Sequence, residues 1–375
     1  MKHLLYTQCK ICFVVILMLI SLLFCINIVQ AETAKKFSLN SPELFDREQV
    51  INSIILANYR ELRAATITLM DTVVDFCADE NTKKQHTIQQ AFIQVRFAWA
   101  KAQIVTFGPI SFLRRKERFD FWPDKHRVGE KQVRNLLNLT TPLPEDLLAL
   151  QNKSVAIQGL GALERMLYAK SGFVTEKQCH LSILIAENLA NIAGEVFAQW
   201  SEKPILFQND LLNPQSGITF FADASEVVST IANDMTTQLR IVSDIKLARS
   251  LPTRGKNKGN FRKLETWRTG RSFQLMLENI STVQLYYELG FAESLQDIDP
   301  SLHQELTQLF ALSIKQLSAL NEQAQTNLST VFKVPDFLEK IRESQESIQQ
   351  IDRLIKTKLL ARYGLTLKFN ALDGD

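Results

Sequence analysis

The sequence is poor in the two residues that most often interrupt regular structure. Its 375 residues include only 13 glycines and 10 prolines. A protein built from short strands needs many turns that contain Gly or Pro, so this shortage argues against an all-β fold and favours long helices. We therefore expect an all-α protein.

An excess of charge of one sign is also missing. The 43 Lys and Arg residues against 40 Asp and Glu residues give a formal net charge of +3. No chain-wide basic field exists that would attract nucleic acid, so we expect no nucleic-acid partner. With 46% hydrophobic and 22% charged residues, the composition excludes wholesale disorder and a polytopic membrane protein.

The one long apolar run lies at the N-terminus. Lys2 and Lys10 precede an apolar stretch over 11–29, and Val29-Gln30-Ala31 places modest side chains at positions −3 and −1 of a cleavage site. This order is typical of a secretory signal peptide over 1–31, and we predict cleavage after Ala31. An uncleaved membrane anchor is the alternative, because the run is long enough to span a bilayer. No later stretch reaches that length, so the mature chain has no predicted transmembrane segment.

Only two cysteines remain once the signal peptide is removed. Cys9, Cys12 and Cys25 lie within it, whereas Cys77 and Cys179 do not. Two cysteines in an oxidising compartment are more often paired than free. We predict a disulfide between Cys77 and Cys179.

Apolar residues recur at helical spacing along most of the mature chain. One stripe runs from Ile51 to Phe76, and another from Phe337 to Leu359 follows Pro335 and ends near Gly364. Further helices are expected over 87–107, 155–168, 225–249, 264–289 and 299–324. Residues 201–221 contain Pro204, Pro214 and Gly217 and resemble a connection between two halves. We expect two antiparallel helical bundles over 32–200 and 201–375, with a site at their interface.

Motifs of common catalytic centres are missing. The sequence contains no H-E-x-x-H, and no G-x-S-x-G, Walker loop or G-x-G-x-x-G stands in a usable context. The five histidines are scattered, and none pairs with another at metal-ligand spacing. Sequence motifs alone therefore identify no catalytic residue.

The least ordinary helix is the one predicted over 155–168. Gly159 and Gly161 lie in an apolar context, and each costs about 1 kcal/mol against alanine in a helix interior. Such glycines are tolerated where a backbone or a ligand comes close. Glu164 lies one turn after Gly161 among apolar residues. It is either a buried acid that binds a cation or a polar ligand, or the partner of a structural arginine.

Two further segments offer polar and aromatic side chains. In ETWRTGRSF, Trp267, Arg268 and Ser272 crowd one predicted helix start, and Arg268 is a candidate partner for a ligand carboxylate or for Glu164 itself. In FDFWPD, Trp122 and Asp124 flank Pro123, and Trp122 either lines a pocket or fills a gap in the core. The basic loop 249–263 would touch lipid headgroups or a partner, or would only be a solvated loop.

Four blocks together give the chain its resemblance to the imelysin family, in particular to imelysin-like proteins exported by Gram-negative bacteria. The resemblance covers nearly all of the mature chain, about 45–375. The blocks are WAKAQIVTFGP (99–109), RFDFWPD (118–124), GLGALERMLY (159–168) and ETWRTGRS (265–272), and the tail GLTLKFNALDGD (364–375) also resembles such proteins.

This resemblance implies two helical bundles with a site between them, a periplasmic or membrane-associated location and a link to iron uptake. The family is named for a peptidase activity, and its hallmark is G-x-H-x-x-E. Carried onto this chain, Gly159 and Glu164 match the motif, whereas Gly161 replaces its histidine. Glu164 is then the one motif residue left to hold a metal, and a lone carboxylate binds transition metals weakly.

Three functions follow as hypotheses. The favoured one is a non-catalytic periplasmic binding protein for a small polar or metal-bearing ligand, associated with iron uptake and with envelope iron-transport or redox proteins. It would use Glu164, the two motif glycines, and the side chains of Trp122, Asp124, Trp267, Arg268 and Ser272, with an iron or other transition-metal ion as the implied cofactor. The second is an exported metallopeptidase, for which His126 would replace the missing histidine. The third is a structural or interaction protein of the envelope.

Overall fold

The computed structural model describes residues 44–79, 82–138, 142–169, 175–202, 207–253, 258–325 and 327–365. The predicted signal peptide over 1–31 and its cleavage site at Ala31 lie outside these residues. Helices connected by loops make up the described part, which contains no β-strand. The prediction of an all-α fold is confirmed.

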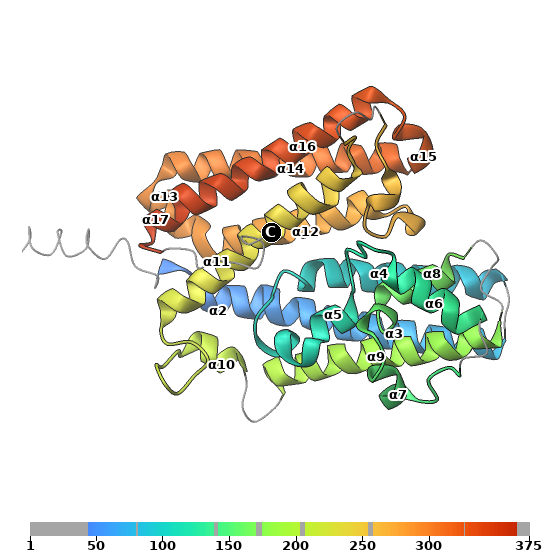
Figure 1. Ribbon diagram of the computed structural model, residues 1–375. Helices are drawn as coiled ribbons and strands as arrows, with labels where there is room; N and C mark the ends of the chain where they lie inside the picture. Colours follow the sequence, from blue (N-terminus) through green and yellow to red (C-terminus); the bar gives the residue numbers. More distant parts are fainter. Residues whose placement is uncertain are drawn as a thin grey trace, which may run out of the picture.

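The first half of the chain forms one group of packed helices, the lower group in Figure 1. The long helix α3 (Ala57–Ala78) packs against both α4 (Thr82–Ala102) and α9 (Glu176–Ser201). Shorter elements complete this half: α2 (Arg47–Val50), η3 (Ile51–Leu56), η4 (Gly108–Arg114), α5 (Arg115–Phe119), α6 (Val128–Asn138), α7 (Leu147–Gln151), η5 (Val155–Ile157) and α8 (Leu160–Leu167).

Apart from α10 (Phe207–Leu212), which lies at the lower left and packs against α9, the second half forms the upper group (Figure 1). Helix α14 (Pro300–Ala324) packs against α12 (Ser272–Tyr287) and α16 (Pro335–Leu354), and α12 also packs against α4 of the first group. The other elements are α11 (Ala224–Arg240), η6 (Ile241–Leu247), η7 (Ala248–Ser250), η8 (Phe261–Lys263), η9 (Trp267–Thr269), η10 (Glu288–Ala292), α13 (Glu293–Ile298), α15 (Leu328–Val331), η11 (Ile355–Leu359) and α17 (Leu360–Arg362).

Two predicted helical stripes form parts of the core. Ile51, Leu62 and Phe76 are among the fully buried residues of the first stripe, and Ile341 and Ile351 are among those of the second. Pro335 occupies the first turn of α16, where a missing N–H costs nothing. Gly364, with φ of +64°, ends the last helix.

The predicted disulfide is present. Cys77 of α3 is bonded to Cys179 of α9, 102 residues later. It therefore links two long helices that already pack against each other.

Three predicted helix limits are wrong, each for a local reason. The helix expected to end at residue 107 ends at Ala102, and the helix expected from 264 begins at Ser272. The helix expected over 155–168 is broken, because α8 begins only at Leu160 with Gly159 as its N-cap. A Cβ atom at Gly159 would lie 2.2 Å from the Phe119 carbonyl oxygen. The glycine therefore permits the C-terminal end of α5 to pass close to the start of α8.

Helix α9 is the one described helix that could cross a bilayer by length and composition. In the folded protein, 61% of the most hydrophobic 18-residue stretch of α9 is buried. Its apolar face packs against α3 and α8, as in a core helix of a globular protein.

Candidate functional site

A cavity of about 640 Å³ lies between the two groups of helices. One wall comes from the first half: residues 120–125 between α5 and α6, and Gly161, Glu164 and Arg165 of α8. The opposite wall comes from the second half, mainly from residues 262–268 ahead of α12. The predicted site at the interface between the two halves thus corresponds to a cavity.

Glu164 is a buried carboxylate on the wall of this cavity. The residue is 5% exposed. Its Oε2 accepts a hydrogen bond of 3.0 Å from the Thr266 hydroxyl, and its Oε1 lies 3.5 Å from Arg268 Nη1. Both partners come from the second half of the chain, so the carboxylate joins the two walls. The distance to Arg268 is long for a charge-assisted hydrogen bond.

The Thr266 hydroxyl is aimed by a strained backbone. Thr266 has φ of +54°, a left-handed conformation that is unfavourable for a β-branched residue. Two local hydrogen bonds hold the segment: Thr269 Oγ1 donates to the Thr266 carbonyl at 2.9 Å, and Ser272 Oγ donates to the Glu265 carbonyl at 2.6 Å. This turn presents Thr266 to Glu164 while Glu265 enters a separate charged cluster.

That cluster, which we call the floor network, consists of Arg96, Asp120, Lys246 and Glu265. Arg96 lies 2.8 Å from Asp120 and 3.1 Å from Glu265, and Lys246 Nζ lies 2.5 Å from the second oxygen of Glu265. These side chains are at most 5% exposed. Arg96 and Asp120 also line the cavity. The two acidic and two basic side chains therefore compensate one another's charge at the bottom of the cavity.

The two acids of the floor network differ in proton affinity. Burial raises the pKa of Asp120 to about 6, although Arg96 opposes the shift. Burial also raises the pKa of Glu265, but Lys246 and Arg96 outweigh it and hold that pKa below its usual value. Glu265 therefore keeps its negative charge to lower pH than Asp120 does.

The loop before α6 is fixed by Asp124. Its carboxylate accepts hydrogen bonds from the backbone N–H groups of Val128 and Gly129 at 2.6 and 3.1 Å, which caps α6. The same carboxylate lies 2.8 Å from Arg165 Nη2 of α8. Trp122 in this loop lines the cavity, and its ring centroid lies 5.8 Å from Lys246 Nζ. Trp122 therefore contributes to a pocket wall.

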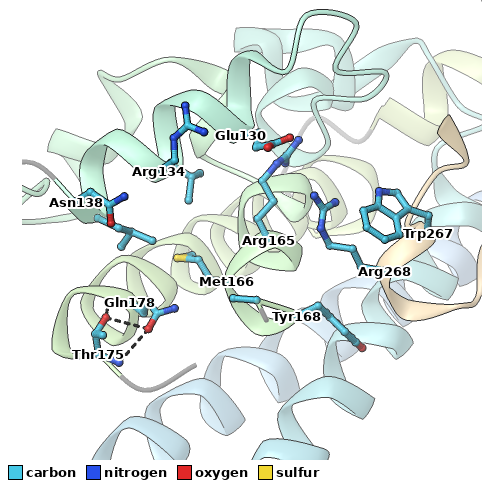
Figure 2. A pocket seen from close by; sticks show the side chains of 13 residues that line it. Glu130, Arg134, Asn138, Arg165, Met166, Tyr168, Thr175, Gln178, Trp267 and Arg268 are labelled. Atoms are coloured by element: carbon cyan, nitrogen blue, oxygen red, sulfur yellow. Dashed lines mark hydrogen bonds between the residues drawn. The ribbon is translucent and has the colours of Figure 1, made fainter. Parts of the chain in front are cut away.

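A second cavity of about 550 Å³ adjoins the first (Figure 2). Glu130, Arg165, Trp267 and Arg268 line both cavities. Figure 2 shows Arg165 and Arg268 beside each other, with Arg134 on the neighbouring α6. The two cavities are therefore neighbours, separated by these four side chains.

The other predicted site residues are placed differently. Gly161 lines the first cavity, and a Cβ atom there would lie 3.1 Å from Arg165 Nη1. Gly159 does not line the cavity, because it serves the close approach to Phe119. Ser272 does not line it either, since its hydroxyl is bonded to the Glu265 carbonyl. His126 is exposed and lies outside the lining.

The donor set does not fit a bare transition-metal ion. Both oxygens of Glu164 already face donors, Thr266 and Arg268, and Gly161 has no side chain. Nowhere in the described ranges do three or more His, Cys, Asp or Glu side chains gather as metal ligands. A divalent ion here would also face the charges of Arg165 and Arg268.

Sequence reasoning did not select Arg96, Lys246, Asp120 or Glu265. A signal was available for two of them. Arg96 lies one turn after the buried Phe92, and Lys246 lies one turn after the buried Val242, so each places a charge on an apolar helix face. Such a charge predicts a buried partner but not which residue supplies it.

Comparisons with known proteins agree with this architecture. The imelysin family (Peptidase M75) matches residues 55–357. An imelysin-like protein from Psychrobacter arcticum 273-4 superimposes with a TM-score of 0.70 and 18% identity over 86% of this chain and 96% of that chain. A putative iron-regulated protein A precursor from Parabacteroides distasonis ATCC 8503 superimposes with a TM-score of 0.67 and 12% identity over 84% of this chain and 94% of that chain.

No curated protein matches the sequence. At these identities the two structures establish a shared fold, and the family match covers most of the chain. The chain belongs to the imelysin family.

Proposed function

We propose that this protein is a non-catalytic binding protein of the cell envelope that holds a small polar ligand in the cavity between its two groups of helices. One observation carries the proposal: Glu164 is 5% exposed yet lines a cavity of about 640 Å³. A buried acid that served only to join the walls would not need an open space beside it. The strained Thr266 adds support, because such strain is concentrated at functional sites.

A periplasmic location and a role in iron uptake belong to the same proposal. The N-terminal segment has the order of a signal peptide, and the disulfide suits an oxidising compartment. The link to iron rests on the family resemblance and on the Parabacteroides protein, which is named as iron-regulated. N-terminal sequencing of the exported protein tests the location, and a mature chain that begins at Glu32 is expected.

Blocking the cavity tests the binding function without knowledge of the ligand. Gly161→Leu would place a large side chain in the cavity, whereas Gly194→Leu is a matched control, because a Cβ atom at Gly194 has no neighbour within 4 Å. Native mass spectrometry of protein isolated from the periplasm under iron limitation should show a small-molecule adduct on wild type and on Gly194→Leu. Gly161→Leu should lack that adduct. An adduct of equal abundance on all three proteins would contradict the proposal, as would the lack of any adduct on wild type.

A further inference from the structure

We propose, on the basis of the binding function above, that the ligand of this cavity is a small multiply charged oxyanion, with carboxylate or phosphate groups as its recognised chemistry. Iron would enter this site as part of an anionic chelate. The excess of positive charge in the lining, the pairing of its acidic side chains and its buried donors without partners support this ligand class.

Positive charge is concentrated at this cavity. Eight basic and four acidic side chains line it, a formal excess of four positive charges. The whole chain has a formal excess of only three. A cavity of one sign with low-dielectric walls concentrates ions of the opposite sign.

Each of the four lining acids already has a basic partner. Asp120 is paired with Arg96, Asp124 with Arg165, Glu164 with Arg268, and Glu130 with Arg127. Four lining cations remain, Lys125, Arg249, Arg262 and Lys263, which we call the rim cations. Among the residues that the structure describes, none of the rim cations has a carboxylate within ion-pair distance.

The Trp267 ring orients two arginines without accepting hydrogen bonds from their N–H groups. The guanidinium carbon of Arg268 lies 4.6 Å from the centroid of the Trp267 ring, and that of Arg262 lies 5.8 Å from the same centroid. Contact with an indole face orients a guanidinium and leaves its N–H groups available in its plane. Such planar donor groups match the geometry of carboxylate and phosphate oxygens.

Three buried donors in the lining of this cavity are unsatisfied. Nε of Arg96, Nε of Arg165 and an Nη of Arg249 are buried without a hydrogen-bond partner. The Arg96 side chain is only 2% exposed, and all three residues line the cavity. Unsatisfied buried donors are rare and costly in folded proteins, and an acceptor-rich ligand would relieve that cost.

The size of the cavity limits the class of ligand. A volume of about 640 Å³ suits a small molecule or a compact chelate. Polycarboxylates and pyrophosphate carry several negative charges within that volume and can hold iron through their own oxygens. They would supply the metal ligands that Gly161 and Glu164 do not.

Calorimetric titration of the full mature chain tests the inference. The probes are citrate, pyrophosphate, ferric citrate, Fe²⁺ alone and spermidine. Arg262→Gln/Lys263→Gln removes two rim cations, and Lys315→Gln/Lys333→Gln is the matched control, since both lysines are exposed and lie outside the cavity lining. At low salt, citrate or pyrophosphate should bind wild type and the control equally and bind the rim variant at least tenfold more weakly. The affinity for wild type should also fall as salt rises.

The different probes and variants separate the possible ligand classes. Tighter binding of ferric citrate than of free citrate would support delivery of iron as a chelate, whereas tighter binding of pyrophosphate would assign a phosphate ligand within the same class. Equal weakening in the rim and control variants would overturn the inference, because general surface charge would then explain it. Binding of Fe²⁺ or spermidine, lost in Gly161→Leu, without anion binding would overturn the anion class and leave the proposed binding function standing. If none of the probes binds, the inference of an oxyanion ligand is also overturned.

Discussion

The floor network and the rim cations both contain Lys and Arg, but these side chains have different roles in the two sets. In the floor network two bases and two acids lie within 3.1 Å of a partner and are almost entirely buried. The rim cations lie on the same cavity, and three of them, Lys125, Arg262 and Lys263, are exposed. Compensated charges therefore join the halves of the molecule, whereas the uncompensated ones are available to a ligand.

Energetics explain why the two sets cannot exchange roles. A buried charge that loses its partner destabilises the folded state by several kcal/mol, so each charge of the floor network must keep its partner. An exposed cation costs little when unpaired, so Lys125, Arg262 and Lys263 can remain unpaired until a ligand binds. Stability and binding should accordingly respond to different substitutions.

The largest effect is expected in the floor network. Glu265→Ala would leave Lys246 without its carboxylate and Arg96 with one of two, and the free energy of unfolding should fall by about 3–5 kcal/mol. Urea denaturation measures this loss. Glu305→Ala, which breaks the exposed pair with Lys358, is the control and should cost less than about 1 kcal/mol. Similar losses for both variants would show that the floor network does not depend on charge compensation.

A smaller loss of stability is expected from the disulfide, which belongs to neither set of charges. Cys77→Ser/Cys179→Ser should lower the free energy of unfolding by about 2–4 kcal/mol, because the bond closes a long loop. Citrate affinity should stay within twofold of wild type, because neither cysteine lines the cavity. A tenfold change in affinity would mean that the cavity depends on the link between α3 and α9. Thiol counting on native protein should find no free thiol at these positions.

Buried acids should make stability depend on pH in a defined direction. Burial raises the pKa of Asp234 to about 6, although hydrogen bonds from Thr106 and the charge of Lys116 oppose the shift. The raised pKa means that the folded state binds this proton more tightly than the unfolded state. The stabilisation is therefore present at low pH and is lost as pH rises through about 6.

Asp234→Asn replaces the titrating carboxyl with an amide, so the variant lacks the pH dependence of stability that Asp234 causes. Between pH 7 and pH 5, wild type should gain about 1 kcal/mol of unfolding free energy relative to the variant. Denaturation at the two pH values measures the difference. An unchanged or reversed difference would show that Asp234 is already ionised at pH 5 in the folded protein.

The smallest effect on stability is expected at the rim. Arg262→Gln/Lys263→Gln should change the free energy of unfolding by no more than about 0.5 kcal/mol, because both side chains are exposed and neither has a carboxylate partner among the described residues. The same variant should lose at least tenfold in citrate affinity. A loss of stability comparable to that of Glu265→Ala would remove the distinction between floor and rim.

Local patterns in the sequence predicted much of the architecture. Periodicity located the stripes of α3 and α16, and the count of cysteines identified the disulfide between Cys77 and Cys179. Glu164, an acid in an apolar context, and Arg268, an arginine beside a tryptophan, are candidate partners on the sequence alone, with a ligand carboxylate as the alternative partner of Arg268. The structure places the two side chains 3.5 Å apart. Whether they bind a ligand remains a prediction.

Long-range pairing and backbone contacts could not be derived in this way. Arg96 and Glu265 are far apart in the sequence, and only tertiary packing brings them to 3.1 Å. Gly159 was interpreted as interior to a helix, but its role depends on the carbonyl of Phe119 from another segment. Ser272 was grouped with Arg268 by proximity in the sequence, yet the turn directs its hydroxyl to the backbone.

Hydrogen–deuterium exchange with and without saturating citrate tests most directly whether a ligand bridges the two halves. Residues 120–125 and 262–268 lie on opposite walls of the cavity. If the ligand binds between them, amide exchange in both segments should slow together, and Gly161→Leu should abolish that protection. Protection of only one segment, or unchanged exchange in both, would contradict a ligand site between the two halves.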